Sequence, residues 1–173
     1  EYSWLHLLSM PVELEALQRR QILEPEKEKQ LKSTIPILQG IKNNVSCKVQ
    51  ELYEQDPHPK WLSLRLPPAP KPFSVIIKEL NLRTTSKYLG EVDAPQILIA
   101  GCGTWQPITT ASWYKNCDVL AIDLSLSSLA FAKRKTKELG ISNIDYMQAD
   151  ILDLEALNRK FDIIISTGVL HHM

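Results

Sequence analysis

Apolar residues in the first third of the chain recur at helical spacing. Residues 45–54 predict a helix, because Val45, Val49 and Leu52 fall on one of its faces. The run 24–32 is dominated by charge and predicts a solvated helix face or a loop. We therefore expect residues 1–56 to form a helical segment.

A proline-rich stretch follows this segment. It contains six prolines: Pro57, Pro59, Pro67, Pro68, Pro70 and Pro72. Because proline lacks a backbone donor, a regular helix or a central strand is excluded there. Residues 57–94 are predicted to be a stiff, extended connector with a short helix over 73–80. Trp61, Leu64 and Leu66 indicate that the connector packs against the domain that follows.

From residue 95 onward, short apolar runs alternate with helical patterns. The expected strands are 96–100, 118–122, 143–147 and 161–166, and the expected helices are 107–114, 126–139 and 153–158. Ser125 can cap the second of these helices and Gly140 can end it. Strands joined by helices of this length predict right-handed βαβ units and a parallel sheet, so residues 95–173 are assigned to an α/β domain.

Charge and cysteine content narrow the class of protein. Among 173 residues, Lys and Arg number 20 and Asp and Glu also number 20, so nucleic acid is not indicated as a partner. No apolar run is long enough for a membrane-spanning helix, and no membrane association is expected. The three cysteines are scattered, which favours a reducing compartment, the cytoplasm, and predicts no zinc site.

Candidate binding residues stand where three of the predicted strands end. Gly101 and Gly103 follow the first strand, Asp123 ends the second, and Asp150 follows the third. In a doubly wound sheet these ends share one edge, where glycines admit a ligand and a carboxylate accepts ribose hydroxyls. A nucleoside ligand is the leading interpretation. The alternative treats Asp150 and Asp153 as helix caps and Asp123 as a turn residue.

Four stretches of the chain together resemble a known family. They are "ILIAGCGT", "VLAIDLSLSSLAFAKRK", "NIDYMQADILDL" and "FDIIISTGVLHHM". In this order and spacing they resemble the motifs of class I S-adenosylmethionine-dependent methyltransferases, over about residues 95–173. Residues 53–61, "YEQDPHPKW", resemble the segment that precedes this domain in a bacterial subgroup.

The resemblance implies a Rossmann-like partial sheet of strand order 3-2-1-4, with S-adenosylmethionine as the cofactor. It assigns the cofactor site to Gly101, Cys102, Gly103, Asp123, Leu124, Asp150, Ile151 and Ser166. Within this set, the glycines would approach the methionine part and Asp123 the ribose hydroxyls. Asp150 would meet the adenine amino group with Ile151 beside the ring, and Ser166 would face the methyl group and the substrate.

Other chemical roles are less favoured. A dinucleotide-binding dehydrogenase would need glycine where the chain has Gln106. His171 and His172 fit packing at a helix start better than catalysis, and Cys102 fits a small buried residue better than a nucleophile. No catalytic residue is assigned, since a sulfonium donor is already activated and rate can come from alignment.

Three residues depart from the family pattern. Trp105 replaces the usual third glycine, so a positive φ there would strain the backbone and an inward indole would fill the cofactor's space. If the indole obstructs the site, Trp105→Gly should tighten cofactor binding. Pro107 shortens the loop, and Ile165 stands where relatives often carry a polar group.

The motif series stops after the fourth strand, whereas complete members continue with further strands. We therefore expect a fragment whose fourth strand is an open apolar edge that favours self-association. Two functions remain open. One is methyl transfer from S-adenosylmethionine to an unidentified acceptor, with turnover by this chain in doubt. The other is a non-catalytic binding or scaffold domain derived from the same fold.

Overall fold

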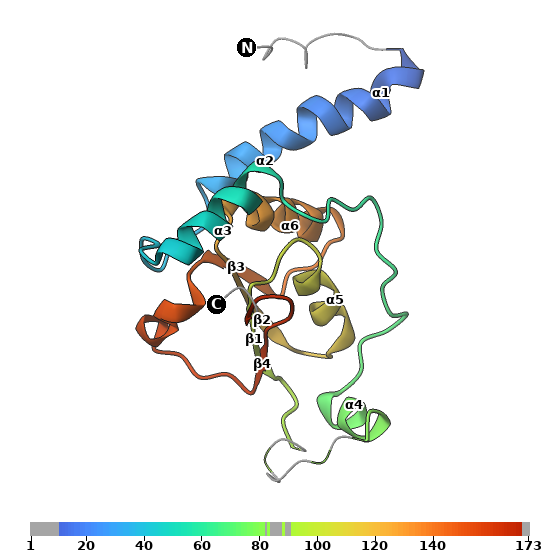
Figure 1. The fold of residues 1–173 in the computed structure, drawn as a ribbon. Coiled ribbons are helices and arrows are strands. Elements are labelled where there is room, and N and C mark those ends of the chain that lie inside the picture. Colours follow the sequence, from blue (N-terminus) through green and yellow to red (C-terminus); the bar gives the residue numbers. More distant parts are fainter. Residues whose placement is uncertain (1–10, 82, 84–87, 89–90, 171–173) are drawn as a thin grey trace.

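The chain folds around a four-stranded parallel sheet in the computed structural model, which describes residues 11–81, 83, 88 and 91–170 (Figure 1). The strands are β1 (Gln96–Ala100), β2 (Asp118–Asp123), β3 (Ile144–Gln148) and β4 (Ile163–Ile165). Their order in the sheet is β3-β2-β1-β4, and every pairing is parallel. The predicted α/β class and the 3-2-1-4 order are confirmed.

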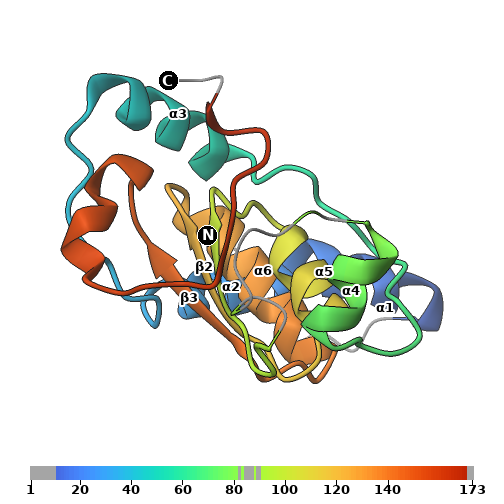
Figure 2. The same ribbon diagram turned by 90° about the horizontal axis from the view of Figure 1, so that it is seen from below.

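Helices cover both faces of the sheet. The helices of the described residues are α1 (Val12–Gln18), η2 (Arg19–Leu23), α2 (Glu24–Lys32), α3 (Asn44–Gln55), α4 (Phe73–Glu79), α5 (Gln106–Trp113), α6 (Leu126–Glu138) and the 3-10 helix η4 (Ile151–Leu157). Figure 2 shows α5 and α6 on one side of the strands and η4, in orange-red, on the other. The chain therefore changes face after β3, so β1 and β4 flank the point at which a doubly wound sheet opens a crevice.

Side chains alternate between two hydrophobic clusters, because successive strand residues point to opposite faces. On the side of α5 and α6, Ile97 and Ile99 pack with Leu129. On the other side, Leu98 and Ala100 pack with Ala149 and with partly buried residues of η4. The sheet is thus enclosed on both faces, as the continuous apolar strand sequences require.

Local sequence signals explain where the helix after β2 begins and ends. Ser125 Oγ accepts the backbone N–H of Ser128 at 3.0 Å, so Ser125 is the N-cap of α6. Gly140 follows the last turn with a φ of 69°, the left-handed conformation in which glycine is favoured. Both predicted signals are confirmed.

The N-terminal helices form a rod that crosses α6. The elements α1, η2 and α2 run on without a break and the rod extends away from the sheet (Figure 1). Its attachment is Arg134 of α6, whose side chain is 4% exposed and pairs with Glu24 at 3.2 Å and Glu28 at 2.8 Å. The charged run 24–32 is thus helical, and its acidic side faces the protein rather than only water.

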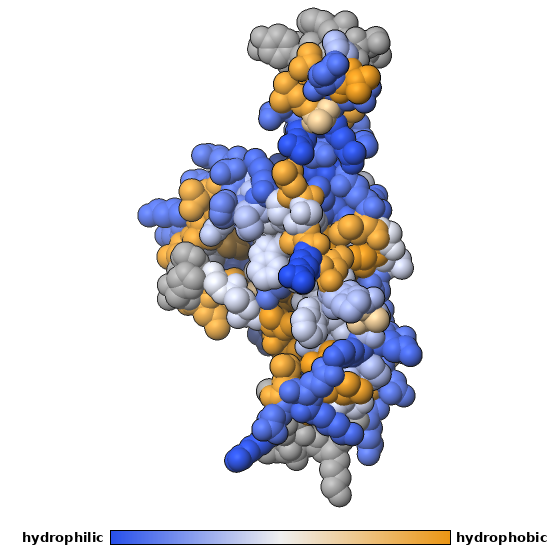
Figure 3. Space-filling view, turned by 90° about the vertical axis from the view of Figure 1, so that its right-hand side faces the viewer, coloured by the Kyte–Doolittle hydropathy of each residue, from blue (hydrophilic) through white to orange (hydrophobic). Residues whose placement is uncertain are grey.

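The far end of the rod lies outside the body of the molecule. None of the residues of α1 is buried, and Val12, Leu14 and Leu17 are exposed. Figure 3 shows apolar surface, in orange, on the projection at the top of the view. Among the described residues, no helix is both long and apolar enough to cross a membrane.

Residues 57–72 of the proline-rich connector lead from α3 past α5 to α4 (Figure 1), and they pack against the domain at Trp61, as predicted. Trp61 Nε1 donates to the carbonyl oxygen of Thr104 at 3.1 Å, and Thr104 Oγ1 donates to the carbonyl oxygen of Pro59 at 2.6 Å. The Trp61 ring meets Phe131 of α6 edge-on, with 5.8 Å between centroids. The connector is therefore joined to the loop after β1.

The two edges of the sheet differ. Along β3, a short segment pairs with the strand end: Gln148 N–H donates to the carbonyl oxygen of Pro36, and Leu38 N–H donates to that of Gln148, both at 2.9 Å. Within the described part of the chain no segment pairs with the outer edge of β4, where Ile164 is 65% exposed. The open edge predicted for the fourth strand is present in this structure.

Element boundaries differ from the predictions by a few residues. The fourth strand ends at Ile165 rather than residue 166, because only Ile163–Ile165 pair with β1. The last predicted helix begins at Ile151, since Asp150 caps it. His171 and His172 lie outside the described residues, and the domain limits at residues 56 and 94 stay predictions.

Candidate functional site

A cavity of about 200 Å³ opens at the carboxyl edge of β1, β2 and β3. Its walls come from the loop after β1, the turn after β2, the start of η4, the loop after β4 and helix α3. Its lining includes Gly101, Cys102, Gly103, Asp123, Leu124, Asp150 and Ile151. The structure therefore brings seven of the eight predicted site residues to one cavity; their role in binding stays a prediction.

The two glycines of the loop are needed for different reasons. Gly101 has a φ of 75°, and a Cβ there would collide with the side chain of Val169. Gly103 has a φ of 56°, and a Cβ there would meet no atom within 4 Å. The first glycine lets the loop after β4 approach closely, and the second presents bare backbone at the cavity.

Asp123 links the loop after β1 with the turn after β2. Its Oδ2 accepts the N–H of Gly103 at 2.8 Å, and its Oδ1 accepts the N–H of Ser125 at 3.0 Å. Burial raises the pKa of the Asp123 carboxyl above its ordinary value, although these backbone donors act in the opposite direction. Each oxygen keeps a further lone pair, so the carboxylate can still accept hydroxyl donors from a ligand.

Asp150 is 3% exposed and lies between β3 and η4. Its Oδ1 accepts the N–H of Leu152 at 3.0 Å and so caps η4. Among the described residues no group donates to its Oδ2, and Ile151 lies next to it in the cavity wall. The capping role and a ligand-binding role are compatible, since they use different oxygens.

Ser166 and Ile165 lie at the end of β4, but neither belongs to the cavity lining. Ser166 Oγ is buried and has no hydrogen-bond partner among the described residues. Ile165 packs against the hydrophobic cluster on the side of α5 and α6. The isoleucine thus fills the core, rather than occupying a polar position beside the cavity.

Trp105 does not have the strained backbone considered from the sequence. Its φ is −125°, an ordinary value for any residue, so no positive φ penalises a side chain there. The residue is the N-cap position of α5, is 42% exposed, and forms part of the cavity wall. The strain expected for a side chain at this position is therefore absent.

Cys102 faces the cavity but is a poor nucleophile. The residue is 2% exposed, and burial, with a smaller contribution from the Asp123 carboxylate, raises the pKa of its thiol well above the ordinary value. Because the thiolate is the reactive form, the thiol is inert at neutral pH. All three cysteines are free, and the described residues contain no cluster of metal-ligating side chains.

Sequence reasoning missed one complete wall of the cavity. Val45, Ser46, Val49 and Tyr53 of α3 line it, together with His58 of the connector. The signal was the stretch 53–61, which was noted only for its resemblance to a segment preceding the domain. Its position beside the cofactor edge depends on contacts between residues far apart in sequence.

The lining carries two carboxylates, of Asp123 and Asp150, and neither a lysine nor an arginine among its described residues. Acceptor oxygens at two strand ends, bare glycine backbone and apolar walls suit a nucleoside with hydroxyl and amino donors. A ligand with several phosphates would meet no countercharge here. The cavity therefore favours a nucleoside without phosphates.

Comparisons with known proteins agree with this geometry. Residues 97–173 match the family model described as a methyltransferase domain. An uncharacterized protein of Synechococcus sp. is 34% identical over 87 residues, which are 48% of this chain and 20% of the relative. A probable (S)-tetrahydroprotoberberine N-methyltransferase of Papaver bracteatum is 30% identical over 82 residues, which are 47% of this chain and 23% of the relative.

The chain thus spans about a fifth of the length of these two relatives. Among solved structures, magnesium protoporphyrin IX methyltransferase of Synechocystis, with bound S-adenosylmethionine, is similar in fold. The match covers 78% of this chain and 67% of the methyltransferase chain. The TM-score is 0.49 at 17% identity. S-adenosylmethionine is the cofactor of the matched family. Residues 97–173 of this chain thus match a methyltransferase-domain family, and their β3-β2-β1-β4 parallel sheet is the Rossmann-like fold predicted from the resemblance to class I S-adenosylmethionine-dependent methyltransferases.

Proposed function

We propose that this chain binds S-adenosylmethionine in the cavity at the carboxyl ends of β1, β2 and β3 and takes part in methyl transfer to an acceptor that is not yet identified. The observation that carries the proposal is the meeting of Gly103, Asp123 and Asp150 at one cavity. When bound, the cofactor supplies a methyl group on a positively charged sulfur. The residues present fit it, because the cavity has acidic oxygens and open glycine backbone.

Each wall of the cavity has a separate task in this proposal. The Asp123 carboxylate accepts the ribose hydroxyls, and the second oxygen of Asp150 accepts the adenine amino group beside Ile151. Apolar side chains of α3 exclude water from the opposite side. Together these groups hold the nucleoside in one orientation, which is the main requirement when the methyl donor is already activated.

A second candidate function is a binding or scaffold domain without turnover. Its support is Ile165, which offers no polar group at the end of β4, and the indole of Trp105 in the cavity wall. Both functions would use the same cavity. They differ in whether an acceptor is methylated, and the scattered free thiols suit either function in the cytoplasm.

Calorimetric titration with S-adenosylhomocysteine tests the proposal. We expect saturable binding by wild type and a loss of about 10- to 150-fold in affinity for Asp123→Ala, because hydrogen bonds to a charged group contribute about 1.5–3 kcal/mol. Asp145→Asn is the matched control, since Asp145 is exposed on β3 and does not line the cavity.

Absence of binding by folded wild-type protein would refute cofactor binding by this chain. If wild type binds the cofactor but transfers no methyl group to any acceptor class offered, the scaffold function is favoured. Circular dichroism at the titration temperature verifies that each variant is folded.

A further inference from the structure

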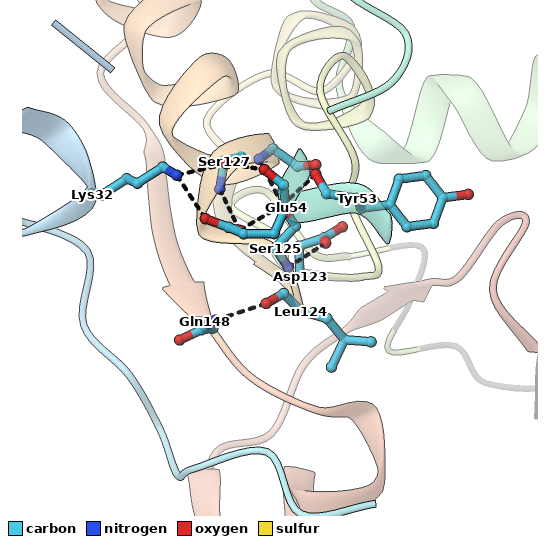
Figure 4. Close-up of polar contacts among 9 residues, drawn as sticks. Lys32, Tyr53, Glu54, Asp123, Leu124, Ser125, Ser127 and Gln148 are labelled. Atoms are coloured by element: carbon cyan, nitrogen blue, oxygen red, sulfur yellow. Dashed lines mark hydrogen bonds and ion pairs between the residues drawn. The ribbon is translucent and has the colours of Figure 1, made fainter. Parts of the chain in front are cut away.

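We propose that Glu54, at the end of α3, is a positioning residue that holds α3 against the start of α6, beside the cavity, and thereby sets cofactor affinity. We call its contacts with Lys32, Ser125 and Ser127 the latch. The inference rests on the proposed function. Figure 4 shows the side chains concerned: Glu54 lies between Lys32 of α2 and the two serines at the start of α6, with Asp123 beside them. Glu54 and Lys32 both lie outside the four family motifs.

Glu54 is joined to the first turn of α6 through one carboxylate oxygen, Oε2, and through its carbonyl group. Its Oε2 accepts the N–H of Ser127 and the hydroxyl of Ser125, each at 3.0 Å. Its carbonyl oxygen accepts the Ser127 hydroxyl at 2.8 Å. The free N–H groups at a helix start need such acceptors, and a negative charge there is favoured by the helix dipole.

Lys32 closes the latch from the side of the N-terminal rod. Its Nζ donates to Glu54 Oε1 and to Ser127 Oγ, both at 2.6 Å. Burial alone would raise the pKa of Glu54, but the hydrogen bonds from Lys32 and Ser127 outweigh it and leave the pKa below its ordinary value. The carboxylate is therefore charged, and the latch closed, at neutral pH.

The latch reaches the cofactor residues through Ser125. The hydroxyl of Ser125 is held by Glu54 and by the carbonyl oxygen of Tyr53 at 3.0 Å, while its N–H donates to Asp123 Oδ1. A second hold comes from Gln148, whose Nε2 donates to the carbonyl oxygen of Leu124 at 2.7 Å. The turn that presents Asp123 and Leu124 to the cavity is thus fixed from both sides.

Releasing Glu54 would have two effects on the cavity. Helix α3 supplies Val45, Ser46, Val49 and Tyr53 to the wall, and among the described helices it contacts α6 most extensively. The same release frees Ser125 to turn away from Asp123. Cofactor affinity should therefore fall even when the sheet remains folded.

The test compares substitutions at position 54 by calorimetry with S-adenosylhomocysteine. We expect Glu54→Ala to weaken binding by about tenfold or more, and Glu54→Gln to lie between it and wild type, because glutamine keeps one acceptor oxygen. Glu51→Ala is the matched control on α3, since Glu51 is exposed and lines no part of the cavity. An affinity for folded Glu54→Ala equal to that of wild type would overturn the inference.

A charge exchange separates a positioning role from a simple ion pair. Lys32→Glu combined with Glu54→Lys restores opposite charges, but a lysine at position 54 offers no acceptor to Ser127 N–H or to the Ser125 hydroxyl. We expect the double variant to bind as poorly as Glu54→Ala. Recovery of wild-type affinity would show that charge alone matters and would refute the positioning role.

Amide hydrogen exchange measured without ligand tests the latch independently of cofactor binding, and so independently of the proposed function. Glu54→Gln and Lys32→Met should speed exchange in α3 and residues 124–128 while β1 and β2 stay protected. Unchanged exchange in α3 would refute the latch. If wild type fails to bind S-adenosylhomocysteine, the proposed function fails, and exchange alone decides whether the latch exists.

Discussion

Trp105 forms part of the cavity wall with an ordinary backbone conformation and a partly exposed indole. We therefore expect Trp105→Gly to change the affinity for S-adenosylhomocysteine by less than about fivefold, or ~1 kcal/mol, since the native backbone stores no strain for glycine to relieve. Titration calorimetry measures this directly. A gain of tenfold or more would show that the indole occupies the cofactor's space.

Single residues also show what sequence could predict about the site. The strand ends placed Gly101, Asp123 and Asp150 at one edge, because carboxyl ends of parallel strands share an edge. Sequence could not decide whether Asp150 caps η4 or binds a ligand, since one carboxylate has oxygens for both roles. The conformation of Trp105 was also beyond reach, because its φ depends on how the loop packs against the connector.

At the scale of elements, Arg134 fastens the N-terminal rod to α6. The side chain is 4% exposed and has ion pairs to Glu24, Glu28 and Glu138, the last at 2.8 Å. Arg134→Met would leave three carboxylates around an apolar side chain, and removing one partner of a buried pair costs about 3–5 kcal/mol. Because these glutamates are partly exposed, we expect a loss at the lower end of this range. The free energy of unfolding, measured by urea denaturation, should fall by about 3 kcal/mol.

Lys137→Met is the control for this prediction, since Lys137 is exposed on the same helix and forms no ion pair among the described residues. The contribution of these ion pairs to stability also depends on pH. Burial would raise the pKa of Glu138, but Arg134 outweighs it and leaves the pKa below the ordinary 4.5. Its contribution is therefore complete above that pH and is lost as the pH falls through the lower folded value.

The elements of the sheet were more predictable than the arrangement of the N-terminal helices. Each strand of the parallel sheet is a local apolar run, so its position follows from a few neighbouring residues. The docking of α2 and α3 on α6 depends on pairs such as Glu28 with Arg134, which are 106 positions apart. From sequence alone, a charged run such as 24–32 predicts a solvent-exposed segment, because the distant residue that pairs with it, here Arg134, is not known.

At the scale of the whole molecule, the outer edge of β4 has no paired strand among the described residues. Ile164 is 65% exposed beside this edge, whereas segment 36–38 covers the end of β3. We propose that copies of this chain pair through β4, and we expect association that Ile164→Lys reduces, because a charge on an edge strand opposes pairing. Small-angle scattering over a concentration series measures both. A monodisperse wild-type monomer would contradict the prediction.

The latch and the rod also impose an order on folding. Residues 24–55 emerge from the ribosome before α6, which begins at Leu126 and holds them through Arg134 and Ser127. During synthesis these helices have no docking surface, and long-range contacts form only after the intervening chain is made. The wall of the cavity that is synthesised first is therefore put in place only after α6 has been made.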